Sequence, residues 1–326
     1  MNEVHWYPVL RAKKLRKKPV QVKFEGEKLA VFRTKDGVAA IQDRCPHRSA
    51  SLSGGRVVGE SIECPYHGWR FDGTGVCTHI PLANCANANR RVKAWAAREA
   101  HGLIFITRDA ETAGDIRGPV WDDQPKVSRI LQSHARATLA DAVENVLDPV
   151  HTLFVHKGII RGGGGPTNSV TLNAGTEQGE LVLRYSGEEQ SNGLLSRLLE
   201  RQRSYAISRF YRPGMVSLEY WGKGGLNLVT TLYFTREDDT HLRGFAVMTG
   251  PRQGVLGWLK AALFVPLMRI VIKQDLKIMA DATANWDAAG RPPHAQGPLD
   301  LLYPLIQQVL DGETGDVAAQ EVTLDI

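Results

Sequence analysis

The stretch "CPHRSASLSGGRVVGESIECPYHGW", residues 45–69, brings together side chains that the rest of the chain uses sparingly. It holds two of the four cysteines and two of the ten histidines, as Cys45-x-His47 and Cys64-x-x-His67 with sixteen residues between the pairs. Its glycines and prolines favour tight loops over helix. Such Cys/His loops form a disulfide, a zinc site or an iron–sulfur cluster.

The start of the chain argues against a disulfide. It reads MNEVHWYPVL, without a basic segment followed by an apolar core and a small-residue cleavage site. We therefore expect a cytoplasmic protein. In that reducing compartment, a cluster of cysteines and histidines is more typical of a metal site than of a disulfide.

The ligand spacing favours iron over zinc. Structural zinc sites usually pair cysteines two residues apart and add a separate pair of histidines. Here each loop supplies one thiolate and one imidazole. Two thiolates for one iron and two imidazoles for the other is the ligand set of a Rieske-type [2Fe–2S] cluster. The sequence thus predicts a cluster held by Cys45, His47, Cys64 and His67.

The pattern CPHR…CPYHGW, with "WYPVLRAKKLRKKPV" before it and "RFDGTGVC" after it, resembles the N-terminal domain of Rieske non-heme iron oxygenases. Rieske proteins of respiratory complexes are similar, but they carry an extra cysteine in each loop, and these form a disulfide. Ala50 and Tyr66 occupy those places here. The resemblance therefore implies the branch of oxygenases and ferredoxins.

The chain of 326 residues is long enough for two domains. Up to about residue 108 it reads as short alternating strands, which predicts an all-β domain. A polar, proline-containing stretch at 109–126 marks the connection, and we place the domains at 1–115 and 116–326.

The second domain combines helices with strands. We expect a helical segment near 139–156, strands over about 170–249 and a C-terminal helix through 275–285. This order resembles the helix-grip catalytic domain of the same oxygenases, an antiparallel sheet with a long C-terminal helix, so the predicted fold class is α+β.

Positive charge is concentrated near the N-terminus. The net charge is +5, and six basic residues lie between Arg11 and Lys18. Two interpretations stay open, a solvated edge and a docking surface for an acidic ferredoxin or reductase. No nucleic-acid motif accompanies the run. The apolar stretch 254–272 contains Lys260, Pro266 and Arg269, which favours a buried helix over a transmembrane span.

A second motif follows at 141–156, "DAVENVLDPVHTLFVH". Asn145, Asp148 and His151 recur every three residues and would share one stripe of a helix. His156 lies five residues further on, off that stripe. Pro149 lacks an N–H, so either the helix kinks there or Asp148 caps a new turn. Both alternatives leave a carboxylate just before two imidazoles.

Two histidines and one carboxylate form the facial triad of non-heme Fe(II) oxygenases. The third ligand should lie on "RIVIKQDLKIMADATANWD", where Asp275, Asp281 and Asp287 are candidates. Residues three and four positions on either side of Asp275 are apolar, so this carboxylate would be buried and in need of a partner. Asp281 has polar neighbours one turn away, and Asp287 lies near the helix end. We therefore predict Asp275.

The resemblance assigns roles to these residues. His151 and His156 correspond to iron ligands, Asp148 to a bridging carboxylate, and Asn145 to a residue near the iron. It further implies a head-to-tail homotrimer, in which Asp148 links His151 to His67 of the partner subunit.

The predicted function is that of a terminal oxygenase component, which uses O2 and a mononuclear Fe(II) to hydroxylate or demethylate a small organic substrate. No G-x-G-x-x-G follows a strand, and we interpret "RGGGGP" at 161–166 as a loop. Electrons should therefore come from a separate NAD(P)H-dependent reductase, with or without a ferredoxin between them. The alternatives are a ring-dihydroxylating dioxygenase and an electron carrier with a non-catalytic second domain. Iron content separates the carrier, at about two atoms per chain, from an oxygenase, at about three.

Overall fold

The computed structural model describes residues 4–82, 85–121, 125–160, 169–186, 203–252, 254–297, 300–313 and 315–325. The side chains of residues 85–89, 203, 254–263 and 325 are not described. The predicted loop at 161–166 therefore lies outside the described residues. The chain forms two compact units, one of residues 1–118 with 235–239 and one of residues 119–234 with 240–326.

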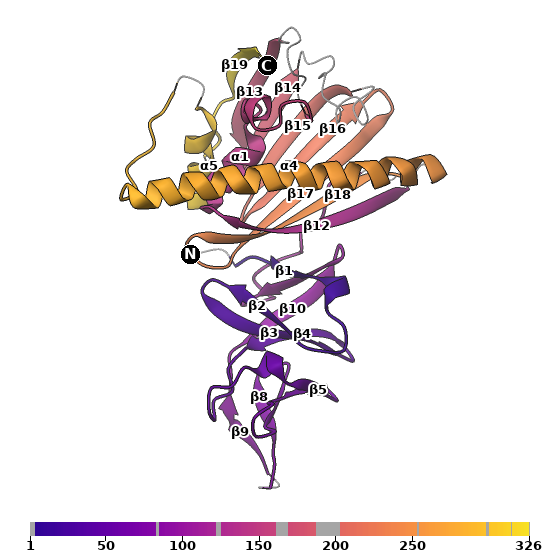
Figure 1. Cartoon of the computed structure of the whole chain (residues 1–326), viewed down its shortest axis with the longest axis vertical. Coiled ribbons are helices and arrows are strands. Elements are labelled where there is room, and N and C mark those ends of the chain that lie inside the picture. The colour runs from indigo at the N-terminus through magenta and orange to yellow at the C-terminus, as the bar shows by residue number, and fades with distance from the viewer. Residues whose placement is uncertain are drawn as a thin grey trace. The chain divides into compact units, whose positions relative to one another are not determined.

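The first unit contains two antiparallel sheets (Figure 1). The larger sheet has the order β1-β11-β10-β4-β3-β2. Its strands are β1 (Tyr7–Arg11), β2 (Val20–Phe24), β3 (Glu27–Thr34), β4 (Gly37–Gln42), β10 (Ala94–Ala100) and β11 (Leu103–Thr107). The smaller sheet runs in chain order through β5 (Arg56–Val58), β6 (Ser61–Glu63), β7 (Arg70–Asp72), β8 (Val76–Ile80) and β9 (Cys85–Arg91). Two short 3₁₀ helices, η1 (Ala12–Lys14) and η2 (Leu52–Gly54), complete this all-β unit.

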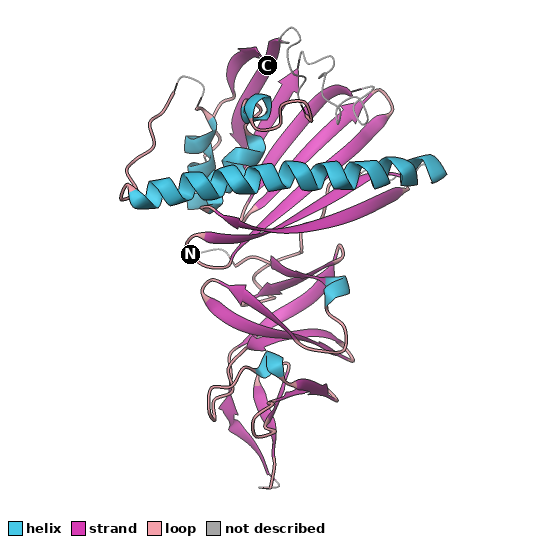
Figure 2. Ribbon diagram, viewed as in Figure 1, coloured by secondary structure: helices cyan, strands magenta, loops and turns pink. Residues whose placement is uncertain are grey.

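The second unit is an eight-stranded sheet with the order β12-β18-β17-β16-β15-β14-β13-β19. Its strands are β12 (Lys126–Arg136), β13 (Ser169–Glu177), β14 (Glu180–Ser186), β15 (Arg203–Tyr211), β16 (Met215–Gly222), β17 (Gly225–Arg236), β18 (His241–Pro251) and β19 (Gln320–Asp325). The helices are α1 (Leu139–Leu147), α2 (His151–Phe154), α4 (Gly254–Ala288) and α5 (Leu302–Asp311). The 35-residue helix α4 lies across the sheet (Figure 2). This is the predicted α+β arrangement.

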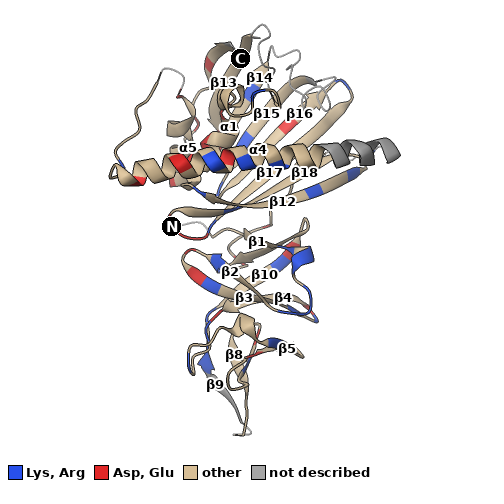
Figure 3. Cartoon of the chain, viewed as in Figure 1, with Lys and Arg blue, Asp and Glu red and all other residues tan. Residues whose placement is uncertain are grey.

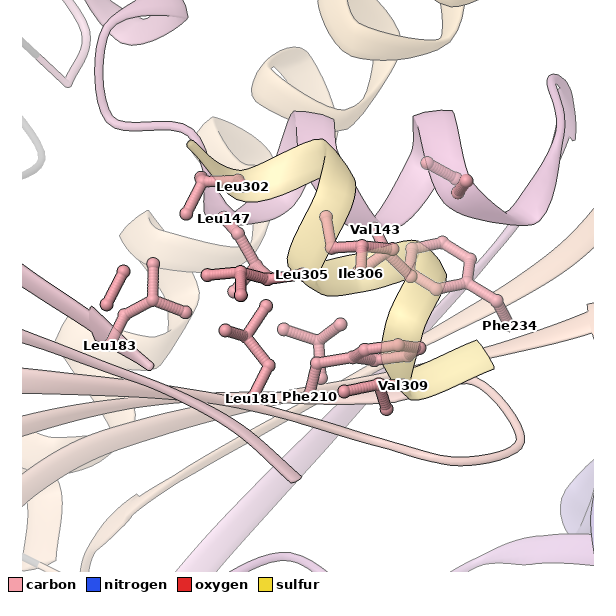
Figure 4. Close-up of a cluster of buried hydrophobic side chains, with 14 of the residues drawn as sticks. Val143, Leu147, Leu181, Leu183, Phe210, Phe234, Leu302, Leu305, Ile306 and Val309 are labelled. Atoms are coloured by element: carbon pink, nitrogen blue, oxygen red, sulfur yellow. The ribbon is translucent and has the colours of Figure 1, made fainter. Parts of the chain in front are cut away.

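The main core of the second unit lies between α1, α5 and the sheet (Figure 4). Val143 and Leu147 from α1 and Ile306 from α5 are almost completely buried in it. On the sheet side of this core, β14 contributes Leu181 and β15 contributes Phe210. Each side chain of this size gains about 1.5–3 kcal/mol on burial, so this contact fixes α1, the element that leads into the second motif.

Helix α4 is anchored by its own apolar side chains. Phe264 is buried against Leu131 of β12 and Met248 of β18, and Met268 packs on the same cluster. Among the described side chains of the predicted buried helix at 254–272, Phe264 and Val271 are buried, whereas Pro266, Arg269 and Ile270 are exposed, so one face of this part of α4 is buried. Within the described residues, no helix has both the length and the hydropathy needed to cross a bilayer.

Candidate metal centres

The two loops of the first motif share one backbone pattern. The N–H of Cys45 donates to the carbonyl of Ala50, and the N–H of Cys64 donates to that of Trp69, both at 2.8 Å. Each cysteine carbonyl in turn accepts from the residue four positions on, Ser49 at 2.9 Å and Gly68 at 3.1 Å. Both of these residues have positive φ, 61° and 70°. A Cβ on Gly68 would lie 2.9 Å from the Pro81 ring, so a larger residue would disturb this loop.

The side chains of these loops divide into a buried thiol pair and an exposed imidazole pair. Cys45 and Cys64 are 2% and 3% exposed. Burial, together with the neighbouring Cys64, raises the pKa of the Cys45 thiol to about 11. The rings of His47 and His67 are exposed, with centroids 4.5 Å apart. Two thiols inside and two imidazoles outside match the asymmetric ligand set of a Rieske cluster.

An aromatic stack supports the histidines. The indole of Trp69 lies face to face with His47, with centroids 4.8 Å apart and planes 4° from parallel. The guanidinium of Arg90 lies 5.0 Å from the centre of the same indole. Tyr66, at one of the two places where respiratory Rieske proteins have a cysteine, lies against His67 with centroids 3.9 Å apart. Each imidazole therefore lies against one aromatic side chain of its own loop.

In the second motif, the predicted helical segment is broken at Pro149. Helix α1 ends at Leu147, and α2 begins at His151. The carboxylate of Asp148 accepts hydrogen bonds from the N–H of Val150 at 2.7 Å and of His151 at 3.1 Å. Of the two alternatives, the structure therefore shows capping of a new turn. The break places His151 and His156 on the same side despite their spacing of five.

These two histidines meet Asp275 of α4. Nε2 of His156 lies 2.9 Å from Oδ1 of Asp275, and Nε2 of His151 lies 3.7 Å from the same oxygen. The three ligand atoms all lie within 4.8 Å of one another. The side chain of His156 is 1% exposed, whereas those of His151 and Asp275 are 17% and 18% exposed. The group is thus enclosed on one side and accessible on the other.

The other ring nitrogens are already occupied. Nδ1 of His151 donates to the backbone carbonyl of Asp148 at 2.6 Å. Nδ1 of His156 donates to the side-chain oxygen Oε1 of Gln274 at 2.9 Å. A neutral imidazole that donates from Nδ1 has its lone pair on Nε2. Both Nε2 atoms are therefore free to bind a cation beside Asp275.

The residues fit a metal ion by a further criterion. Oδ1 of Asp275 is buried and accepts no hydrogen bond from the described residues, although Nε2 of His156 is close to it. Burial lowers the pKa of His156, but the Asp275 carboxylate outweighs it and raises that pKa overall. Two ligands of one ion, each bonded at about 2.1 Å, lie no more than about 4.2 Å apart. The two distances to Asp275, 2.9 Å and 3.7 Å, satisfy this limit, and the two Nε2 atoms lie within 4.8 Å of each other.

The two other aspartates have different neighbours. Asp281 is exposed and accepts from the side-chain amide of Asn285 at 3.3 Å. Asp287 pairs with Arg136 and Arg291, each at 2.9 Å, and these cations lower the pKa of its carboxyl group. Neither belongs to the His–His–Asp group.

Asn145 and Asp148 line a cavity of about 570 Å³ between α1, the C-terminal part of α4, residues 294–296 and residues 300–303. Asp141, Glu144 and Asp300 contribute further carboxylates to its wall. Burial, and then the charges of Asp141, Asp300 and Asp148, raises the pKa of Glu144 to about 7. The sequence did not indicate this acidic cavity, nor did it indicate Gln274. The only signal for Gln274 was its position next to Asp275.

The described arrangement agrees with comparisons to known proteins. Residues 5–96 match the Rieske [2Fe-2S] domain, and residues 135–301 match the vanillate O-demethylase oxygenase C-terminal domain. The chain is 35% identical over 164 residues to cholesterol 7-desaturase nvd 1 of Ciona intestinalis, covering 46% of this chain and 34% of the relative. It is 33% identical over 168 residues to methylxanthine N1-demethylase NdmA of Pseudomonas putida, covering 48% and 47%.

These curated relatives are thus matched over at most about half of their length. The solved structure of Pseudomonas putida CBB5 NdmA with caffeine shares the fold, with a TM-score of 0.76 and 23% identity over 94% of this chain and 88% of that one. The match to the oxygenase C-terminal domain alone covers more than half of the 326 residues. A Rieske [2Fe–2S] domain precedes it, and the chain belongs to the Rieske non-heme iron oxygenases.

Proposed function

We propose that this protein is the terminal oxygenase component of a multicomponent system, which hydroxylates or oxidatively demethylates a small organic substrate. The observation that carries the proposal is the convergence of His151, His156 and Asp275, with both Nδ1 atoms already bonded elsewhere. A chain that only carried electrons would not need this second site. The vanillate O-demethylase domain and the methylxanthine demethylase relative support demethylation as one of its reactions.

In this proposal, the [2Fe–2S] cluster is held by Cys45, His47, Cys64 and His67. A mononuclear iron is held by His151, His156 and Asp275. When bound, the cluster supplies single electrons and the iron supplies dioxygen chemistry. The chain's own residues hold the ligands: the buried thiols fix one side of the cluster site, and the hydrogen bonds to Nδ1 fix the two imidazoles of the iron site.

In this proposal, Asp148 connects the two kinds of site. Its side chain is 33% exposed, and backbone N–H groups hold its carboxylate in a fixed position. The imidazole of His67 is also exposed. We infer a head-to-tail homotrimer, in which Asp148 bridges His151 to His67 of the partner subunit. Asn145 shares the cavity wall with Asp148 and would help to order this contact.

The reducing partner is a separate NAD(P)H-dependent reductase, acting directly or through a ferredoxin. The basic run offers a docking surface for it, because Lys13, Lys14, Arg16, Lys17 and Lys18 are all exposed. Figure 3 marks the lysine and arginine positions along the ribbon in blue. Ala12 and Leu15 of the same run are buried and anchor it to the first unit. Such a surface would mainly raise the encounter rate with an acidic partner.

The decisive test measures iron and turnover together. Purified protein should hold about three iron atoms per chain and show a Rieske EPR signal on reduction. With a surrogate reductase and NADH, a panel of aryl methyl ethers, N-methyl compounds and sterols should reveal substrate-dependent O2 uptake, with formaldehyde release where demethylation occurs. About two iron atoms and no O2 uptake would instead identify an electron carrier. One zinc ion and no colour would refute the cluster.

A further inference from the structure

The two imidazoles of the His–His–Asp group are supported in different ways. Nδ1 of His151 donates to the backbone carbonyl of Asp148, which is present whatever side chain the position carries. Nδ1 of His156 donates to the side chain of Gln274. The support of His156 therefore depends on one amino acid, and that amino acid directly precedes Asp275 on α4.

The direction of this hydrogen bond determines what His156 can bind. When Oε1 of Gln274 accepts, the imidazole proton stays on Nδ1 and the lone pair of Nε2 faces Asp275. The opposite amide orientation would place the Gln274 NH2 against Nδ1 and force the proton onto Nε2. That proton would occupy the position of a metal ion. The side chain of His156 is 1% exposed, so water has little access to take over the role of Gln274.

We propose that Gln274 is a positioning residue for the metal site, which fixes the tautomer and the ring orientation of His156 through Nδ1. The proposal deepens the proposed function and rests on it, because it takes His151, His156 and Asp275 as the ligands. Gln274 and Asp275 are consecutive on one turn of α4, so the same turn supplies a ligand and the support of a second ligand. Loss of the hydrogen-bond partner of a ligating histidine typically lowers metal affinity by about 10- to 100-fold.

Three variants of the full chain test the proposal. Gln274→Leu keeps a similar side-chain size but removes the acceptor. Gln274→Glu keeps an oxygen that can only accept, so it should hold the proton on Nδ1. Lys273→Met is the matched control, since Lys273 is the exposed neighbour on the same helix. The mononuclear site is depleted of metal with the Rieske cluster kept, and Fe(II) is then titrated anaerobically. Bound Fe(II) is read as its nitrosyl EPR signal, which does not depend on turnover.

We expect Gln274→Leu to weaken Fe(II) binding by about 10- to 100-fold, and Gln274→Glu and Lys273→Met to bind within a few-fold of the wild type or more tightly. Wild-type affinity in a folded Gln274→Leu protein would overturn the proposal. A tenfold loss in Gln274→Glu would also overturn it, and this variant remains informative if the leucine variant does not fold. If the wild-type protein binds no Fe(II), the proposed metal site itself is wrong, which is a different outcome.

Discussion

Replacing Glu144 with glutamine should stabilise the protein above neutral pH and leave its stability in acid nearly unchanged. The Glu144 carboxyl lines the acidic cavity, and its pKa is raised to about 7 by burial and by the charges of Asp141, Asp300 and Asp148. No lysine or arginine is among the described residues that line this cavity. Ionised Glu144 is therefore an unfavourable charge in the folded protein.

Proton linkage gives the direction and the size of this change in the free energy of unfolding. Between pH 4.5 and about 7 the folded chain keeps a proton on Glu144 that the unfolded chain has lost. The free energy of unfolding therefore falls as the pH rises through this window and stays lower above it. The gap between about 7 and the ordinary 4.5 corresponds to about 3 kcal/mol at 1.36 kcal/mol per pH unit. Partial solvent exposure reduces this to about 2 kcal/mol.

The assay is differential scanning calorimetry at pH 5 and pH 8. A gain of about 2 kcal/mol in the unit that contains Glu144 corresponds to a rise in Tm of about 4–8 °C at pH 8. At pH 5, where Glu144 is protonated, the Tm values of Glu144→Gln and the wild type should agree closely. Glu321→Gln, at an exposed position of β19, is the control and should change neither Tm. An equal effect of Glu144→Gln at both pH values would refute the electrostatic reasoning.

Two further predictions concern the ligands and the partner. Asp275→Ala should lose the mononuclear iron and all turnover while keeping the Rieske EPR signal, whereas Asp281→Ala should keep both centres. The opposite result would mean that α4 presents a different carboxylate to the histidines. Reductase-supported turnover should fall between 50 and about 300 mM KCl, since exposed charges are screened within a Debye length of about 8 Å at physiological salt. A variant in which the basic residues of 13–18 are replaced by neutral ones should lose this salt dependence. If the wild-type rate does not depend on salt, the basic run is a solvated edge and not a docking surface.

The cluster loops were predictable from sequence because their geometry is local. In CPHRSA and CPYHGW, each cysteine begins a tight loop whose hydrogen bonds span only four or five residues. The meeting of Asp275 with the histidines was also predictable, because its apolar neighbours on both sides indicated the face of α4 that packs on the rest of the unit, although Ile278, one of these neighbours, is 45% exposed. Helical periodicity alone indicates this face, and it is maintained through a helix of 35 residues.

Other features of the structure could not be predicted from the sequence pattern. Pro149 allowed a kink or a new turn, and the outcome depends on capping by Asp148, an interaction worth about 1 kcal/mol that periodicity does not report. Gln274 could not be found because no rule states which neighbour of a buried histidine turns its side chain toward the ring. The acidic cavity could not be predicted without the fold, since Asp300 lies beside Glu144 although the two are more than 150 positions apart in the chain.

Asp148 combines three functions that substitutions can separate. Its backbone carbonyl orients His151, its carboxylate caps α2, and its partly exposed side chain would carry the contact to the partner subunit. Asp148→Asn keeps the carbonyl and one oxygen that can accept from the N–H of Val150. It loses the negative charge between the sites and one of the two capping hydrogen bonds, the one from the N–H of His151. It should therefore retain both metal centres, because part of the cap is kept, and lose most turnover, because the charge is gone.

Asp148→Ala also keeps the carbonyl but removes the cap, at a cost of about 1–2 kcal/mol in a turn that begins at His151. This variant should lose part of the mononuclear iron as well as turnover, and the ratio of iron to Rieske signal measures that loss. Equal iron loss in the asparagine variant would show that the charge of Asp148, and not its cap, holds the iron site. Normal turnover in the asparagine variant would remove Asp148 from the electron path, because its one retained oxygen lacks the charge on which the proposed bridge depends.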